Sequence, residues 1–87
     1  MAEYRILLKS SAAKEIEGID SRGDRRRIVK KIAGLVANPR THGSEKLAGH
    51  EDRYRIREGS YRIVYLTDDS RHEVIVFRVG HRKDVYR

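Results

Sequence analysis

The chain has 87 residues, of which 38% are charged, and its formal net charge is +7. A chain of this length buries only about 60 to 65% of its unfolded surface, so we expect a single small domain over residues 1–87. The absence of cysteine excludes disulfides, cysteine-based metal sites and cysteine nucleophiles. No apolar run has the length of a signal peptide or a transmembrane helix, so we expect a soluble, cytoplasmic protein.

The chain begins with a predicted strand and a predicted helix. Residues 4–8 form a short apolar run that is typical of a strand. The segment 10–19 then repeats apolar side chains at helical spacing, with Ser10 or Ser11 as its candidate N-cap. We therefore expect the first helix to pack an apolar stripe against a sheet.

A second helix follows a break at residues 20–24. Apolar side chains recur at i, i+4, i+7 and i+8 between Ile28 and Val36, which is the spacing of one helix face. Asn38 followed by Pro39 ends the pattern, because the residue before a proline is disfavoured in helical conformation. The exposed face of this helix carries many cations.

The C-terminal half predicts a sheet. Residues 39–52 are polar and contain glycines, and we interpret them as a loop. Three strands are then expected near residues 53–58, 61–67 and 73–80. The predicted fold class is α+β, with two N-terminal helices packed on one face of a small, mainly antiparallel four-stranded sheet.

The hairpin between the second and third expected strands brings arginines together. With Gly59 and Ser60 as a two-residue turn, Arg57 lies directly opposite Arg62, and Arg55 shares their solvent-exposed face. Like charges directly across a strand pair are destabilising, so this face favours an anion such as a phosphate backbone. The alternative is an open sheet face whose arginines serve only solubility.

The last expected strand continues the arginine face. Under strict alternation the core side carries Ile75, Phe77 and Val79, and the arginine side carries Val74, Val76, Arg78, Gly80 and Arg82. The same alternation turns His81 toward the core side. Gly80 is a position at which alternation can break, so the direction of His81 stays open.

Positive charge gathers into two parts of the chain. Six cations face one acid between Arg22 and Lys31, and nine cations face five acids from Arg53 to Arg87. Such blocks are typical of proteins that bind a polyanion, with nucleic acid the first candidate and an anionic membrane the second. A solvated basic surface is the alternative.

Other kinds of site find little support in the sequence. The four histidines are His42, His50, His72 and His81, and they show no metal-ligand spacing. The sequence has no glycine-rich phosphate loop and no serine nucleophile elbow. We therefore expect neither a metal nor a cofactor.

Two segments carry a family resemblance: "EKLAGHEDRYRIREGSYRIVY" and "VFRVGHRKDVYR". With the order of one strand, two helices and three strands, they resemble the RelE branch of the RelE/ParE toxin superfamily over nearly the whole chain. The resemblance implies a type II toxin that enters the ribosomal A site and cleaves messenger RNA there. It also implies a RelB-like antitoxin as partner, contact with operator DNA only through the antitoxin complex, and no membrane partner.

The resemblance also implies site residues. By position in the motifs these are Arg55, Arg57, Arg62, Arg82 and Tyr86. The best-known members have lysines in place of Arg55 and Arg57, and an arginine effectively cannot lose its proton, so neither is a base. Cleavage without metal needs proton transfer at the 2′-hydroxyl and the leaving 5′-oxygen, for which His81 and Tyr86 are the titratable candidates. Tyr86 alternatively stacks on a base.

We therefore expect two sets of functional residues. The catalytic set is Arg57, Arg62, His81, Arg82 and Tyr86. The RNA-binding set is Arg55 and Arg78 together with Arg26, Arg27, Lys30 and Lys31, the last four docking ribosomal RNA.

Two alternatives to an RNA-cleaving enzyme remain from the sequence. One is a ParE-like inhibitor of DNA gyrase that acts by binding alone, and the other is an inactive regulator that contacts only its antitoxin and operator DNA. The set that discriminates them is Arg57, Arg62, Arg82 and Tyr86. An RNA-cleaving site uses these side chains, whereas a gyrase binder has no need of them.

Overall fold

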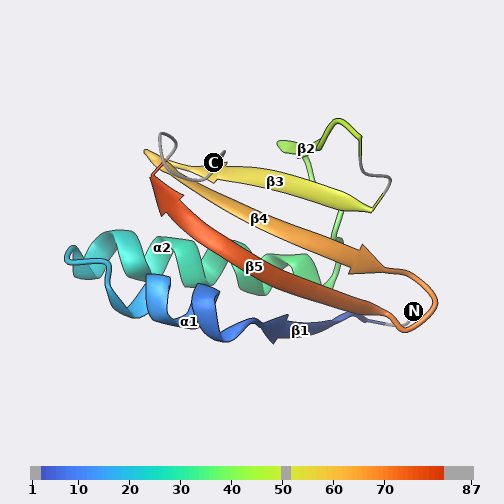
Figure 1. The fold of residues 1–87 in the computed structure, drawn as a ribbon, viewed down its shortest axis with the longest axis horizontal. Coiled ribbons are helices and arrows are strands. Elements are labelled where there is room, and N and C mark those ends of the chain that lie inside the picture. The colour runs from blue at the N-terminus through green and yellow to red at the C-terminus, as the bar shows by residue number, and fades with distance from the viewer. Residues whose placement is uncertain (1–2, 50–51, 82–87) are drawn as a thin grey trace.

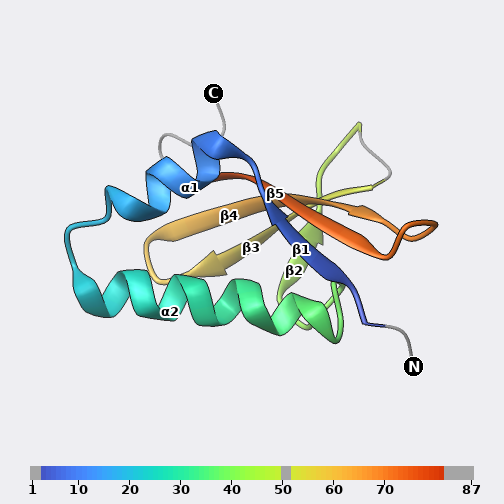
Figure 2. The ribbon, with the colours of Figure 1, turned by 90° about the horizontal axis from the view of Figure 1, so that it is seen from below.

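The structure is a computed structural model that describes residues 3–49 and 52–81. Its elements are β1 (Arg5–Leu8), α1 (Ser10–Glu17), α2 (Arg22–Ala33), the 3-10 turn η1 (Gly34–Val36), β2 (Ser44–Lys46), β3 (Arg53–Glu58), β4 (Tyr61–Asp68) and β5 (Glu73–His81). Both helices lie on one face of a sheet with strand order β1-β5-β4-β3-β2 (Figure 1; Figure 2). Among the strands of these described residues, β1 and β5 pair in parallel and the other neighbours pair antiparallel. The predicted α+β class is therefore confirmed, with five strands in place of four.

The additional strand is β2. It lies within residues 39–52, which we expected to be a loop, and it pairs antiparallel with β3 at the edge of the sheet. Its three residues, Ser44–Lys46, are polar and too few to show the alternation that identifies a strand.

The first helix starts without the predicted serine cap. Its N-cap is Lys9, which makes no side-chain capping bond, so the expectation for Ser10 or Ser11 was wrong. Strand β1 ends at Leu8, and the chain turns directly from strand to helix there. The hydroxyl of Ser11 donates instead to the carbonyl of Phe77 at 3.3 Å.

The second helix starts inside the expected break. The side chain of Ser21 accepts the backbone N–H of Asp24 at 3.2 Å, which satisfies one of the free donors at the helix start. The pattern ends before Pro39 as predicted, with η1 as its last turn. Among residues 3–49 and 52–81 no helix has the length and apolar character needed to span a membrane.

The core lies between the helices and the sheet. Its buried members are Ala12, Ile16, Ile19, Ile28, Ile32, Leu35, Ile56, Ile63, Tyr65, Val74, Val76 and Val79. The helical members fall at the predicted spacing, which confirms the apolar stripes of both helices except at Val36, which is half-buried and lies outside the core cluster. Each fully buried aliphatic side chain contributes about 1.5 to 3 kcal/mol relative to an exposed one.

Strand β5 contains a bulge. Val64 of β4 pairs with Arg78, but the next residue, Tyr65, pairs with Val76. Phe77 is therefore the extra residue on β5, and it shifts the alternation of the strand by one position.

The bulge overturns two of the three residues predicted on the core side of β5. We expected Ile75, Phe77 and Val79 in the core, but Val74 and Val76 are fully buried there together with Val79. Ile75 and Phe77 are half-buried and lie outside the core cluster. The predicted alternation of β5 between the core side and the arginine side was correct only for the residues after the bulge.

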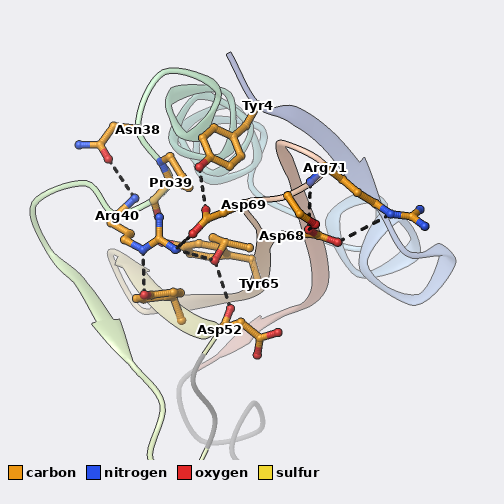
Figure 3. A network of polar contacts seen from close by, with 12 residues as sticks. Tyr4, Asn38, Pro39, Arg40, Asp52, Tyr65, Asp68, Asp69 and Arg71 are labelled. Atoms are coloured by element: carbon orange, nitrogen blue, oxygen red, sulfur yellow. Dashed lines mark hydrogen bonds and ion pairs between the residues drawn. The ribbon is translucent and has the colours of Figure 1, made fainter. Parts of the chain in front are cut away.

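A hydrogen bond of Tyr65 links the loop after α2 to the core. Its side chain is fully buried, and its hydroxyl donates to the carbonyl of Pro39 (Figure 3). Burial raises the pKa of the Tyr65 hydroxyl above its ordinary value. The buried hydroxyl is thus protonated at neutral pH and holds the segment that leads into β2.

A polar network closes the end of the sheet opposite the β3–β4 turn (Figure 3). The guanidinium of Arg40 donates to Asp69 at 2.7 Å and to the hydroxyl of Tyr54 at 3.0 Å. Tyr4 donates its hydroxyl to the same carboxylate at 2.7 Å. The network joins the segment before β1, the loop after α2, strand β3 and the β4–β5 turn, so it fixes this end of the fold.

The network predicts an acid-sensitive contribution to stability. The hydrogen bond from Arg40 lowers the pKa of Asp69 below its ordinary value. The ionised carboxylate therefore stabilises the fold fully above about pH 4 and loses this effect as the pH falls through the folded-state value. We expect Asp69→Asn to lower the Tm at neutral pH, with a difference from wild type that shrinks below about pH 4. Thermal unfolding followed by circular dichroism across this range measures it.

The matched control is Asp20→Asn, which changes an exposed carboxyl of the α1–α2 turn. It should leave the Tm close to the wild-type value. An Asp69→Asn protein that melts with the control at neutral pH would contradict the stabilising role of the network.

Candidate functional site

The β3–β4 hairpin carries arginines on the face of the sheet opposite the helices. Arg57 pairs with Arg62, and Arg55 pairs with Val64, as the sequence predicted. Gly59 has φ of 61°, which the first position of a tight two-residue turn requires and which glycine adopts without strain. The predicted register of the hairpin is thus confirmed.

The three arginines differ in exposure. Arg57 is exposed, and Arg55 is half-buried with its guanidinium 3.4 Å from the Glu45 carboxylate of β2. Arg62 is only 6% exposed, so the expectation that it faces solvent was wrong. Its strand, β4, is the middle strand, and the neighbouring strands β3 and β5 flank its side chain on both sides. The contact of Glu45 with Arg55 was not predicted from the sequence, because strand β2 was not predicted.

Strand β5 adds two residues to the same face. Arg78 pairs with Val64, and Gly80 pairs with Arg62. The Nε of Arg78 lies 3.3 Å from a carboxylate oxygen of Glu15 in α1, so this cation already has an acidic partner. Gly80 has no side chain, so β5 adds none beside Arg62 at this position.

His81 lies on the other side of the sheet from these arginines. It pairs with Tyr61, which packs against the core, and the two ring centroids are 4.5 Å apart. Gly80 therefore does not break the alternation. His81 is exposed and lines a hollow of about 620 Å³ beside α1. The structure does not bring His81 together with Arg57 and Arg62.

Two residues of the expected catalytic set, Arg82 and Tyr86, lie outside the described residues. The described part of the site consists of the hairpin arginines and the adjoining residues of β5. Their geometry supplies positive charge for binding an anion, and Glu45 beside Arg55 adds a carboxylate to the same face.

A second basic surface lies on α2. Its members are Arg26, Arg27, Lys30 and Lys31, of which the first three are exposed. Arg27 forms an ion pair with Asp24, and the Nζ of Lys31 lies 3.6 Å from the Glu58 carboxylate at the end of β3. A hollow of about 430 Å³ opens between this part of α2 and the loop before β2. The surface is separate from the arginine face, because α2 covers the opposite side of the sheet (Figure 2).

Comparison with known proteins identifies the family. The family described as "ParE toxin of type II toxin-antitoxin system, parDE" matches residues 6–86. The chain belongs to the RelE/ParE superfamily of type II toxins.

Its relatives place it among the RelE-like members. Toxin RelE of Mycobacterium tuberculosis is 25% identical over 84 residues, which are 97% of this chain and 87% of that protein. A double arginine-to-alanine variant of E. coli toxin RelE in the free state is 31% identical, with a TM-score of 0.81 over 99% of this chain and 90% of that one. A chain of the intact E. coli RelBE toxin-antitoxin complex is also 31% identical, with a TM-score of 0.78 over 90% and 95%. The predicted resemblance is thus confirmed.

The facing arginines predict a measurable effect on the stability of this RelE-like toxin. Replacing Arg57 with Gln removes one of two like charges directly across a strand pair, which typically matters by about 0.2 to 1 kcal/mol. We expect Arg57→Gln to raise the free energy of unfolding in low salt, measured by urea denaturation. Added inorganic phosphate should stabilise the wild type more than the variant, because it binds the intact pair.

Arg71→Gln is the control, since Arg71 is an exposed arginine of the β4–β5 turn. A wild type and an Arg57→Gln protein with equal responses to phosphate would show that the pair binds no anion.

Proposed function

We propose that this toxin is a metal-independent endoribonuclease that cleaves messenger RNA on the ribosome in the cytoplasm and so inhibits translation. The observation that supports the proposal best is the Arg57–Arg62 pair on the sheet face opposite the two helices. Two like charges held opposite each other favour a bound anion, and the RNA backbone supplies one phosphate per nucleotide.

The arginines stabilise charge at the reacting phosphate. In the proposed reaction the ribose 2′-oxygen loses its proton and bonds to the adjacent phosphorus. The bond from phosphorus to the 5′-oxygen breaks and this oxygen takes up a proton, which gives a 2′,3′-cyclic phosphate and a free 5′-hydroxyl. Guanidinium groups match the phosphate oxygens and cannot lose their protons, so Arg57, Arg62 and Arg82 bind and stabilise the developing negative charge. The low exposure of Arg62 strengthens its interaction with that charge, because little water screens it.

We assign the proton transfer to Tyr86. His81, the alternative, lies on the helix side of the sheet beside Tyr61. A proton acceptor must come within hydrogen-bond reach of the 2′-hydroxyl, and the sheet separates His81 from the arginine face. A tyrosine near several guanidinium groups gains acidity, because positive charge favours the phenolate. Stacking of Tyr86 on a base is the second role open to it.

The basic surface of α2 binds ribosomal RNA in this proposal. Three of its four cations are exposed, and the surface lies apart from the arginine face, so both can hold RNA at once. Phosphate contacts of this kind carry no sequence information, but they position the protein on a large RNA. Arg55 and Arg78 contribute further contacts beside the reacting strand.

The partner that neutralises the toxin is a RelB-like antitoxin, as in the E. coli RelBE complex. Operator DNA is contacted only through the complex of toxin and antitoxin. A ParE-like gyrase inhibitor is the less favoured alternative, since binding alone gives no reason for two facing arginines on the open sheet.

A cleavage assay tests the proposed role of the arginines directly. We expect Arg62→Ala and Arg57→Ala each to lower the single-turnover cleavage rate on programmed ribosomes by about 100- to 1000-fold, since each removes a preorganised charge donor. Mapping the 5′ ends of cellular messenger RNA after induction should give cuts within translated regions for the wild type alone.

Arg71→Ala is the matched control, because this exposed arginine lies at the far end of β4 beside Asp68. It should cleave like the wild type. Induced cells with intact messenger RNA and blocked DNA segregation would contradict the proposal in favour of a gyrase inhibitor.

The proton-transfer assignment has its own test. If Tyr86 is the base, Tyr86→Phe should cleave far more slowly than wild type, whereas His81→Gln should retain most of the rate. Single-turnover rates between about pH 5.5 and 9 measure both, since histidine and a perturbed tyrosine titrate within that range. Loss of an inflection near pH 6 to 7 in His81→Gln alone would instead assign the proton to histidine. A normal rate for Tyr86→Phe with a failed Tyr86→Ala would assign stacking to the ring.

A further inference from the structure

The C-terminal half of β5 extends beyond its partner strand on one edge. β1 pairs with β5 only as far as Leu8 opposite Val76, and Lys9 adds a last backbone bond to the Val76 carbonyl at 2.9 Å. In the part of the chain that the structure describes, no strand pairs with residues 77–81 on that side. Backbone groups at such an edge need other partners, because an unsatisfied buried N–H or carbonyl is costly.

Side chains of α1 take the place of the missing strand. The Ser11 hydroxyl donates to the Phe77 carbonyl at 3.3 Å, and the Glu15 carboxylate accepts the Val79 N–H at 2.7 Å. Ser11 and Glu15 are four residues apart and therefore lie on the same face of the helix. Their spacing along α1 matches the spacing of the backbone groups that they contact on β5.

Glu15 also contacts the side chain of Arg78, the residue before Val79. One carboxylate oxygen accepts Val79 N–H, and the other lies 3.3 Å from the Nε of Arg78. The two side chains are 30% and 33% exposed, so water screens this ion pair only in part. A charged acceptor makes a stronger bond to a backbone N–H than a neutral one does.

The contacts fall directly after the β5 bulge. Phe77 is the bulged residue, and from Arg78 onward the strand follows the shifted alternation that places Gly80 beside Arg62. A bulge disrupts the local ladder and bends the strand, so the segment after it depends more on other contacts. Glu15 supplies two of them within two residues of the bulge.

We infer that Glu15 is a positioning residue for the proposed cleavage site. Its carboxylate fixes the direction of residues 78–81, and with them the position of Arg78 and of Gly80 beside Arg62. The inference rests on the proposed endoribonuclease function. Displacement of reacting groups by about 1 Å costs on the order of 100-fold in rate, so loss of this anchor should lower turnover more than RNA affinity.

The experiment compares Glu15→Ala and Glu15→Gln with Glu17→Ala. Glu17 is an exposed acid on the same helix, so it matches the change in net charge. We expect Glu15→Ala to speed hydrogen exchange of the Val79 amide and to lower single-turnover cleavage by about 10- to 100-fold, with ribosome affinity within about twofold of wild type. Glu15→Gln should retain most of the rate, because its amide oxygen still accepts the Val79 N–H. Glu17→Ala should match the wild type in all three measurements.

Arg78→Ala separates the two contacts of Glu15. In an Arg78→Ala background, Glu15→Gln should cause no further loss, since the charged partner is already absent. A further loss of equal size in both backgrounds would assign the effect to the Val79 N–H bond and not to Arg78. If Glu15→Ala does not fold, Glu15→Gln decides the matter, because faster exchange at Val79 with an unchanged cleavage rate would overturn the positioning role.

Other outcomes distinguish this inference from the proposed function. Glu15→Ala with wild-type exchange at Val79 and wild-type cleavage would overturn the inference alone. A wild type that cleaves no messenger RNA would overturn the proposed function, and the exchange comparison between Glu15→Ala and Glu17→Ala would still decide on the anchor. Equal losses in rate and in ribosome affinity would assign Glu15 to binding and overturn the positioning role.

Discussion

The register of the β3–β4 hairpin constrains both the core and the arginine face. Gly59 permits the two-residue turn, and the turn sets Ile56 opposite Ile63 on the helix side and Arg57 opposite Arg62 on the other. A slip by one residue would turn the arginines into the core and the isoleucines to the open face. The burial of the apolar side therefore holds the two like charges together, although their mutual repulsion opposes it.

Strand β5 also places apolar side chains in the core and an arginine on the opposite face. It does both only because its alternation changes at Phe77. Without an extra residue, Val74 and Val76 would share a face with Arg78, and the core would lose two fully buried side chains or gain a cation. The bulge keeps both valines inside and the arginine outside. Because β1 ends opposite Val76, contacts from α1 take the place of a strand beside the last part of β5.

Sequence predicted the features that depend on a repeated pattern. The apolar stripes of both helices and the hairpin register follow from periodicity and from one glycine, and the structure agrees with them. Periodicity could not locate the bulge, because residues 74–77 are all apolar and fit either face. It also missed the three polar residues of β2 and the burial of Arg62, since exposure depends on which strand is central. The position of Glu15 against β5 requires the packed helix.

The distribution of acids around the arginine face bears on how it recognises an anion. Glu45 lies beside Arg55 at one flank, and Glu15 lies beside Arg78 at the other. Within residues 3–49 and 52–81 no acid comes within ion-pair distance of Arg57. The charges of Arg55 and Arg78 are thus partly compensated at the two flanks. In the proposed function an incoming phosphate therefore meets Arg57 before the compensated flanks, whereas a polyanion that binds by net charge alone would have no preferred position.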